Sequence, residues 1–525
     1  PNSRLTMILE RIVPQSFSAA VLWLIGVILT RLIYNKYGHG LNHVPGPWLA
    51  GFTDLWRLLV VRGRRAQEVH IELHKKYGPA VRLGPRAVSI ADTDALKVIY
   101  SPSAGWSKSK FYPVQQALAK GKRLETMFNT DNDRYHARLR RSVSNAYAMS
   151  TLVTFEPFVD STSAEFIRQL KLRFSDQTGN AGICDFGAWL QFYAFDVIGE
   201  LTFSKRLGFV EKGIDIDNII RDLESFLNYV SWIGQIPFLD NLFIKNPIKI
   251  WLVKYGFLNS SAPVAEFARK HLVERQHEEA SDMPKAPRRD FLNRFKEAHN
   301  KDPDFITEQL VLALTVANMF AGSDTTGITL RAVFYYLLKD PPKMESLLKE
   351  LAAESKAGRF SRDDGLVQWE EVRDLPYLSA VINEALRCHP AVGLTLERIV
   401  PSGGVTLGGH FIPGGSIAGC SPWVIHQDTD VYGADAAEFR PERWIEATPE
   451  QRKKMNSCLL SFGAGARTCV GKNISLLELY KLVPTILRIF ELELVNPDTP
   501  WKLHNAWFVR QMGFNVRLKE RKTIL

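Results

Sequence analysis

One short loop contains the residue types best suited to binding a metal cofactor. The run Ser461 to Gly471 reads SFGAGARTCVG and places a thiol, Cys469, just before a helical pattern from about 472 to 487. The free amides and the dipole at a helix start stabilise a thiolate and donate hydrogen bonds to its sulfur. A thiolate held in this way is suited to axial ligation of haem iron of the oxygen-activating type. The alternative for this loop is an inert cysteine in a glycine-rich turn.

The other residues of the loop support the same chemistry. Arg467 stands two residues before the thiol, and its guanidinium has the geometry to pair with a carboxylate. Three glycines, Gly463, Gly465 and Gly471, permit backbone conformations closed to other residues and close approach to a flat ligand. The loop therefore predicts a site for a planar cofactor that carries carboxylates.

The pattern F-x-x-G-x-R-x-C-x-G resembles that of the cytochrome P-450 superfamily, the haem-thiolate monooxygenases. Its fixed positions are Phe462, Gly465, Arg467, Cys469 and Gly471. The resemblance covers the whole chain. It implies haem b (iron protoporphyrin IX) with Cys469 as the axial iron ligand, and a mainly α fold with a small β part.

A second motif, Ala321 to Thr326 (AGSDTT), lies within a long helical pattern that starts near Glu308. Gly322 in mid-helix costs about 1 kcal/mol relative to Ala, and we expect it to leave space for dioxygen. A threonine hydroxyl can divert a backbone carbonyl and open the helix locally. The resemblance implies that Thr325 hydrogen-bonds the activated oxygen and that Asp324 feeds protons to it. Taken alone, the motif also fits an ordinary polar helix face.

A third motif places Glu384 and Arg387 three residues apart on one face of a predicted helix. The family adds Arg443 as the third member of a buried Glu-Arg-Arg network, in which each charge has a partner. We interpret this triad as a scaffold for the cysteine loop. His426 matches a frequent histidine of the family, for which a structural role is expected.

Haem propionates need cationic or hydrogen-bonding partners. Besides Arg467, the resemblance points to Arg398, His136 and Arg140. His136 departs from the family, which usually has Trp at this position, but a histidine can still donate to a propionate.

The elements that must position these residues form one mostly helical unit. Helical patterns dominate 132 to 355, including 192–201 and 308–338, and short strands are predicted within 74–92, 398–418 and 491–517. With no repeat or composition break, we predict a leader and anchor at 1–35, a polar and proline-rich linker at 36–50, and a catalytic domain at 51–525.

The N-terminal segment carries an apolar run from Phe17 to Thr30, which continues to Tyr34 past Arg31. Its length of about 18 residues approaches the roughly 20 needed to span a bilayer. Because no small-residue cleavage site follows, a retained signal anchor is favoured over a cleaved signal peptide or a buried core helix. We therefore predict a single-pass protein of the endoplasmic reticulum membrane with its catalytic domain in the cytosol.

Charge and cysteine content narrow the classes of partner. The chain has 525 residues, 66 Lys and Arg against 56 Asp and Glu, and a net charge of +10. This mild excess argues against nucleic acid and suits anionic lipid or an acidic protein. The five cysteines include no CxxC pair, which argues against a disulfide framework or a zinc cluster.

The substrate cavity can also be assigned through the resemblance. Its lining would come from about 106–130, Asn318, Phe320 to Ala321, Ala391 to Leu396 and Ala506 to Phe508. Its roof would include 229–247, where Trp232, Ile233, Phe238, Leu242 and Phe243 are apolar for a loop region. Two interpretations stay open for this roof: it dips into the bilayer, or it packs under the fold.

Electrons must come from another protein, because no G-x-G-x-x-G nucleotide fingerprint appears in a strand-turn-helix context. The resemblance to the microsomal type implies NADPH-cytochrome P-450 reductase, with cytochrome b5 as an optional second donor. Arg138, Arg141 and Lys472 flank the predicted thiolate side and could steer an acidic flavoprotein.

The predicted function is insertion of one oxygen atom of O2 into a lipophilic small molecule. Segments 136–157 and 423–433 resemble filamentous-fungal members similar to pisatin demethylase, which implies hydroxylation, epoxidation or oxidative demethylation in secondary metabolism or detoxification. Two alternatives remain: a haem-thiolate isomerase or dehydratase that acts on a peroxide without a reductase, and a non-catalytic membrane haem-binding protein.

Overall fold

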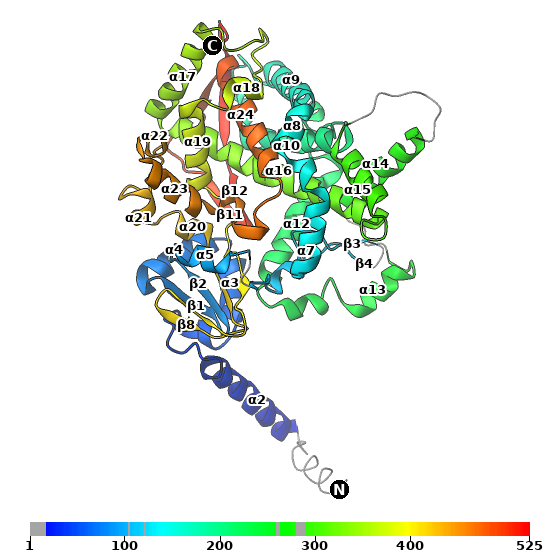
Figure 1. Cartoon of the computed structure of the whole chain (residues 1–525), viewed down its shortest axis with the longest axis vertical. Helices are drawn as coiled ribbons and strands as arrows, with labels where there is room; N and C mark the ends of the chain where they lie inside the picture. The colour runs from blue at the N-terminus through cyan, green and yellow to red at the C-terminus, as the bar shows by residue number, and fades with distance from the viewer. Residues whose placement is uncertain (1–16, 103–104, 120–121, 259–262, 280–288) are drawn as a thin grey trace.

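The structure is a computed structural model that describes residues 17–102, 105–119, 122–258, 263–279 and 289–525. Helices form most of the body, a small β region lies at one end, and one helix projects from that end (Figure 1). The expected mainly α fold with a small β part is confirmed.

The α-helices follow one another along the whole described chain. Their bounds are α2 Phe17–Tyr37, α3 Leu55–Arg62, α4 Ala66–Tyr77, α5 Ala95–Ile99, α6 Phe111–Val114, α7 Asp133–Val143, α8 Met149–Leu152, α9 Glu156–Arg173, α10 Phe186–Phe203, α11 Phe209–Lys212, α12 Ile219–Ile233, α13 Pro247–Lys254, α14 Pro263–Glu279, α15 Phe291–Lys301, α16 Glu308–Lys339, α17 Pro341–Lys356, α18 Trp369–Val372, α19 Pro376–Cys388, α20 Pro422–Ile425, α21 Thr429–Tyr432, α22 Glu442–Glu446, α23 Pro449–Cys458 and α24 Lys472–Ile489.

The strands are short. Their bounds are β1 Ala80–Gly84, β2 Ala87–Ile90, β3 Leu118–Ala119, β4 Lys122–Arg123, β5 Cys184–Asp185, β6 Arg398–Ile399, β7 Val405–Leu407, β8 His410–Ile412, β9 Ile417–Gly419, β10 Phe490–Leu494, β11 Lys502–Ala506, β12 Phe508–Met512 and β13 Asn515–Glu520. One sheet has the order β1-β2-β9-β6 and another β10-β13-β5, while β3-β4, β7-β8 and β11-β12 form two-stranded pairs.

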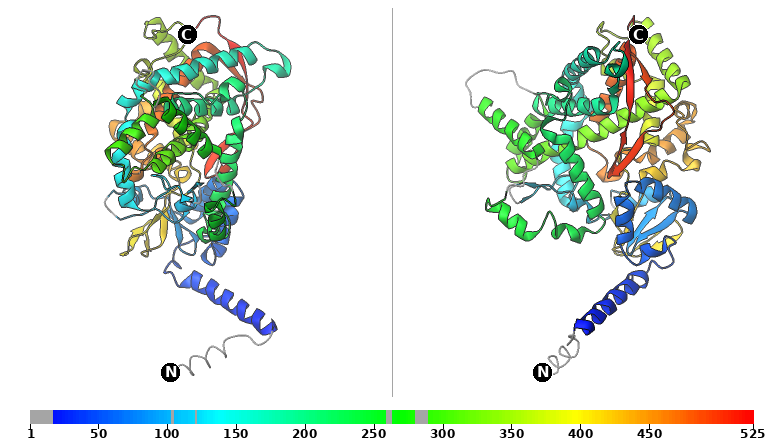
Figure 2. Two further views of the ribbon diagram at one scale, coloured as in Figure 1. Left: turned by 90° about the vertical axis from the view of Figure 1, so that its right-hand side faces the viewer. Right: turned by 180° about the vertical axis from the view of Figure 1, so that it is seen from behind.

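Three long helices, α10, α16 and α24, form the centre of the helical part (Figures 1 and 2). Helix α10 is buried along almost its entire length, which matches its predominantly apolar sequence. Gly322 of α16 faces this helix: a Cβ there would lie 2.9 Å from two atoms of Ile198. The expectation that Gly322 leaves space for dioxygen is therefore wrong, because the missing side chain permits close packing of α16 against α10.

A second, smaller core joins the N-terminal strands to the segment that precedes the cysteine loop. Ala80 and Ile90 from the first strands pack there with Ile412, Cys420 and Leu460. The pairing of β2 with β9 is parallel, so residues more than 300 positions apart share one sheet. This sheet fixes β6, whose first residue is Arg398, beside the helical body.

The N-terminal helix α2 stands apart from the body (Figure 1). It is 21 residues long, none of them is buried, and by length and composition it can cross a membrane. Its C-terminal end is joined to the sheet by Arg82, which donates from Nη1 to the carbonyl of Lys36 (3.0 Å) and from Nη2 to that of Asn35 (2.9 Å). The predicted leader before Phe17 lies outside the described residues.

Candidate active site

The loop before α24 places Cys469 beside the start of that helix. The backbone amides of Gly471 and Lys472, at the start of α24, donate hydrogen bonds to the Cys469 sulfur. Burial raises the pKa of this thiol, and the two amides and Arg140 oppose that effect. Yet the side chain is accessible to solvent. The sulfur is therefore accessible to a bound group.

Glycine conformation sets the shape of this loop. Gly463 and Gly465 have φ of +68° and +65°, in the left-handed region that favours glycine. A Cβ on Gly465 would lie only 1.7 Å from the carbonyl oxygen of Tyr100, so the loop packs directly on the neighbouring backbone. Gly471 has ordinary backbone angles and serves through its amide.

The buried triad forms as expected and connects to the loop. Glu384 accepts hydrogen bonds from Arg387 Nη2 (2.7 Å) and Arg443 Nε (2.8 Å), and all three side chains are buried. Although burial acts to raise it, the pKa of Glu384 is lowered by these guanidiniums. Trp444 Nε1 also donates to Glu384 (2.8 Å), a contact that the sequence analysis did not anticipate.

His426 links the triad to the cysteine loop through hydrogen bonds. Its Nδ1 lies 2.8 Å from the carbonyl oxygen of Arg387, and its Nε2 accepts from the amide of Leu460 (2.8 Å). Ser461 then donates to the carbonyl of Leu386 (2.6 Å). Burial lowers the pKa of His426 to about 3, so it stays neutral and keeps the acceptor nitrogen that Leu460 requires.

The central part of α16 has accessible residues on one face and buried residues on the others. Ala321 and Thr325 are accessible although most of the helix around them is buried. Thr325 Oγ1 donates to the carbonyl of Ala321 (2.7 Å), and the helix runs through this point without a break. The local opening expected from the threonine is therefore absent. Thr326 Oγ1 lies 2.8 Å from Ser475 Oγ, which fixes α16 against α24 just behind the cysteine loop.

Asp324 is buried and points toward α10. Its Oδ1 accepts from Gln191 Nε2 (2.5 Å), and Gln191 Oε1 accepts from Arg331 Nη2 (2.8 Å). Burial raises the pKa of Asp324 to about 6, while Arg331 and Gln191 oppose the shift. Asp324 also lines a pocket with about 280 Å³ of open space, together with Glu224, Leu227, Asn228, His504, Ala506, Phe508 and Arg510. The sequence analysis missed Gln191 and Arg331 because they act through contacts between helices.

The four residues expected to bind carboxylates gather on one side of the loop. Arg467 Nη2 donates to Asp133 (2.6 Å), and Arg140 Nη1 donates to the carbonyl of Thr468 (2.7 Å). His136 and Arg398 are buried. Burial, followed by Arg467, Lys108, Arg140 and Arg398, lowers the pKa of His136 to about 3, so these four cations lie within electrostatic reach of His136. Sequence reasoning missed Lys108.

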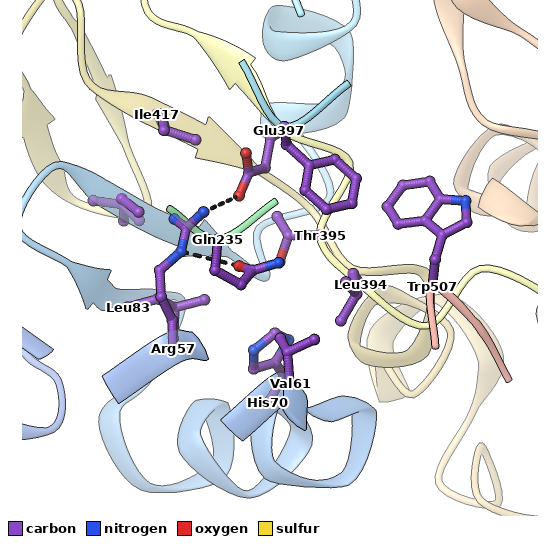
Figure 3. A pocket seen from close by; sticks show the side chains of 13 residues that line it. Arg57, Val61, His70, Leu83, Gln235, Leu394, Thr395, Glu397, Ile417 and Trp507 are labelled. Carbon is purple, nitrogen blue, oxygen red and sulfur yellow. Dashed lines mark hydrogen bonds and ion pairs between the residues drawn. The ribbon is translucent and has the colours of Figure 1, made fainter. Parts of the chain in front are cut away.

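A second pocket is lined by α3, by the segment before β6 and by Trp507 (Figure 3). It has about 450 Å³ of open space and includes Phe111, Leu394, Thr395 and Trp507, which come from three of the segments predicted to line the substrate cavity. Arg57 in this pocket donates from Nη2 to Glu397 Oε1 (3.0 Å) and from Nε to Gln235 Oε1 (3.0 Å). The hydrogen bond from the Gly393 amide to the Trp507 carbonyl (2.8 Å) holds two of these segments together.

The donor set fits a haem. A sulfur that receives two amide hydrogen bonds matches a thiolate iron ligand, and the cations nearby match the propionates. The fold and the site thus define the class of haem-thiolate proteins. Residues 45–515 match the Cytochrome P450 family model, and the chain belongs to the cytochrome P450 family.

Curated relatives from fungi agree with this family. The chain is 44% identical over 454 residues to a cytochrome P450 monooxygenase of Aspergillus terreus, covering 86% of this chain and 90% of that protein. It is 41% identical over 484 residues to cytochrome P450 monooxygenase cicH of Emericella nidulans, covering 92% and 95%. It is 40% identical to cytochrome P450 monooxygenase mpaDE of Penicillium roqueforti, with 94% of this chain and 57% of that longer protein covered. The chain is therefore a monooxygenase of a fungal P450 family.

Proposed function

We propose that this haem monooxygenase inserts one oxygen atom of O2 into a lipophilic small molecule, by hydroxylation, epoxidation or oxidative demethylation, in fungal secondary metabolism or detoxification. The observation that carries the proposal is the pair of amide hydrogen bonds on the Cys469 sulfur, within a loop anchored to the buried triad. The catalytic domain is assigned to 51–525, after an anchor at 1–35 and a linker at 36–50.

Cys469 would provide the thiolate ligand of the haem iron, and Arg467, Arg398, His136 and Arg140 would hold the propionates. Haem bound in this site supplies the activation of dioxygen and the one-electron chemistry. The Gly471 and Lys472 amides donate to the sulfur and moderate its charge. Phe462 is only partly buried, and its carbonyl accepts from the amide of Cys469 (2.8 Å), which sets the direction of the thiol.

Asp324 and Thr325 manage protons. Because Gln191 occupies Oδ1 of Asp324, the proton of the neutral acid resides on Oδ2. A pKa of about 6 lets this carboxyl both hold and release a proton near neutral pH. Thr325 keeps a hydroxyl on the accessible face of α16, one residue from this acid.

Electrons come from NADPH through NADPH-cytochrome P-450 reductase, with cytochrome b5 as an optional second donor. Arg141 and Lys472 are exposed beside the cysteine loop and can steer an acidic partner. Arg138 is less free for this role, because it pairs with Asp302 (2.8 Å).

The proposed location is the endoplasmic reticulum membrane, with α2 as the anchor and the catalytic domain in the cytosol. The roof segment adds a second contact with lipid: Phe238, Leu242 and Phe243 are exposed, whereas Ile233 is buried and Trp232 packs against Arg62. Exposed apolar residues continue along α13, and α13, α3 and α2 lie at the same end of the molecule (Figures 1 and 2).

The test of this function is spectroscopic. The reduced protein with carbon monoxide should show the red-shifted Soret band of thiolate ligation, and Cys469→Ser should abolish it. Cys458→Ser is a matched control, since Cys458 belongs to the second core. Reductase and NADPH should then yield an oxygenated product from a lipophilic substrate panel. A normal Soret band together with turnover of peroxides alone would indicate the isomerase. A haem-loaded protein with neither oxygenase nor peroxide activity would contradict a catalytic function.

A further inference from the structure

Asp324 is the last member of a chain of hydrogen bonds that begins at a buried arginine. Arg331 Nη2 donates to Gln191 Oε1 (2.8 Å), and Gln191 Nε2 donates to Asp324 Oδ1 (2.5 Å). Arg331 is 3% exposed, Gln191 4% and Asp324 3%. The chain runs from α16 to α10 and back, at a point where Gly327 lets the two helices approach closely: a Cβ there would lie 3.3 Å from the Gln191 Cα.

The arginine sets the direction of this chain. A guanidinium only donates hydrogen bonds, so the group of Gln191 that faces Arg331 must be the amide oxygen. The amide nitrogen of Gln191 then faces Asp324, and it only donates as well. Asp324 Oδ1 must therefore accept whether the carboxyl is charged or neutral, and the exchangeable proton is confined to Oδ2.

Arg331 is a buried cation that makes no direct ion pair among the described residues. Its Nε donates to the carbonyl of Gly187 (2.7 Å), and its Nη1 has no hydrogen-bond partner in the described part of the chain. The acids that act on it through space are Asp324 and Asp185. Burial of a cation without a contacting carboxylate is costly, and its electrostatic effect on Asp324 offers a reason for this cost.

Asp324 also borders open space. No hydrogen bond to its Oδ2 occurs among the described residues, and Asp324 lines the pocket of about 280 Å³. The other titratable groups of this pocket are Glu224 of α12, His504 of β11 and Arg510 of β12. Glu224 and Arg510 pair with each other, and their side chains are 33% and 20% exposed, so the pocket extends toward solvent.

We propose that Arg331, acting through Gln191, is a positioning residue that confines the exchangeable proton of Asp324 to Oδ2, the oxygen left for this pocket. A proton given up by Oδ2 is then replaced at the same oxygen, and neither Gln191 nor Arg331 transfers one. This inference rests on the proposed function, because it takes Asp324 as the acid that supplies protons to the reaction.

The test is an infrared pH titration of the haem-loaded, full-length protein. The carbonyl band of protonated Asp324 is the band that Asp324→Asn abolishes, and in the wild type it should titrate near pH 6. Gln191→Met removes the donor that stabilises the charged carboxylate, and Arg331→Met removes the cation behind it. The midpoint should therefore rise in both variants, by about 1 pH unit for the loss of one hydrogen bond to a charged group.

The matched control is Gln511→Met. Gln511 is a glutamine of β12 that is 3% exposed and also donates to α16, through the carbonyl of Ile328 (3.0 Å), but it has no contact with Asp324. Its replacement should leave the midpoint unchanged. An unchanged midpoint in Gln191→Met or in Arg331→Met, or an equal shift in Gln511→Met, would overturn the assignment.

The wild type provides a measurement that needs no variant, should Gln191→Met and Arg331→Met fail to fold. Because Oδ1 of the neutral acid accepts from Gln191, the C=O stretch that titrates near pH 6 should lie below that of monomeric acetic acid in an apolar solvent. A band at the frequency of the free acid would overturn the assignment. Absence of the thiolate Soret band is a different result, because it contradicts the proposed function and not the role of Arg331.

Discussion

At the scale of single residues, the site combines one proposed iron ligand, Cys469, with side chains that act through their charge. Cys469 and Arg467 belong to one loop, whereas Asp324 depends on Gln191 and Arg331 from two helices. The direction of each pKa shift follows from burial first and neighbours second. Because burial dominates the pKa of Asp324, the role of this acid predicts a pH dependence that can be tested.

Asp324→Asn should reduce product formation on the order of 10²-fold at pH 7, the low end of what a positioned acid contributes. Because burial raises the pKa of Asp324 to about 6, its protonated fraction falls as pH rises above 6. Product formed per NADPH in the wild type should therefore decline from pH 6 to 8, with more peroxide released.

The control is the rate of the first electron transfer, measured at each pH by trapping the reduced protein with carbon monoxide. Asp324→Asn should leave that rate unchanged and should flatten the pH profile of coupling. A variant that retains the slope of the wild type would assign the pH dependence to another group.

Sequence alone predicted the residues whose roles are local. Glu384 and Arg387 lie in one short motif, and the structure pairs them as predicted. Cys469 and Arg467 lie in another, and their roles toward iron and propionate stay predictions. Gln191 and Lys108 escaped prediction because no motif surrounds them, and their partners lie 133 and 290 positions away. The role of Gly322 was misjudged because the direction of a missing side chain depends on which helix packs against it.

At the scale of elements, α24 combines the ligand loop with a buried acid. Glu478 is fully buried, and neither carboxylate oxygen has a hydrogen-bond partner among the described residues. Burial raises the pKa of Glu478 well above its usual value, so the side chain is neutral in the folded protein. An unpartnered buried acid lowers stability wherever the unfolded chain would ionise it.

Glu478→Gln should therefore stabilise the protein at neutral pH. Above about pH 4.5 the unfolded chain releases the Glu478 proton and the folded protein does not, so the wild type loses stability as pH rises. Glutamine has no such proton. The denaturant midpoint of the haem-loaded protein in lipid nanodiscs should be higher for the variant at pH 7.5 and equal to that of the wild type near pH 4.

The exposed Glu493 on β10 provides the control, because Glu493→Gln should change neither midpoint. A Glu478→Gln variant that is destabilised equally at both pH values would mean that the carboxyl contributes through packing or an internal hydrogen bond instead. The sequence could predict the helix 472–487 from its pattern, but not that its one acid, Glu478, has no hydrogen-bond partner among the described residues.

At the scale of the whole molecule, apolar surface and the α2 helix gather at one end. Exposed apolar residues there are Trp48, Leu49, Leu55, Leu59, Phe238, Leu242, Phe243, Ile248, Trp251 and Phe257. They belong to segments 48–59 and 238–257, which are far apart in sequence but lie at the end that carries α2 (Figure 1). Exposed apolar residues gathered at one end are expected where a protein meets a membrane or another protein, and the proposed anchor favours the membrane.

A phospholipid with a photoreactive group in its acyl chain should label both segments in the full-length protein reconstituted in vesicles. Leu172 is the internal control, because it is 66% exposed but lies at the end of α9, remote from α2. Mass spectrometry of the labelled peptides provides the measurement. Labelling of α2 alone would show that only the anchor meets the lipid.

The clamp formed by Arg82 on the carbonyls of Asn35 and Lys36 has a consequence for encounters in the plane of the membrane. A freely jointed tether would let the body tumble, and a partner anchored in the same bilayer would meet its surface in every orientation. With α2 in the bilayer, as proposed, a stiff joint would restrict rotation to the axis of the bilayer normal, and the face with Arg141 and Lys472 would keep a constant height above the lipid. Encounters with a partner in the same membrane would then repeat with nearly the same geometry, and a larger share of them would form a complex.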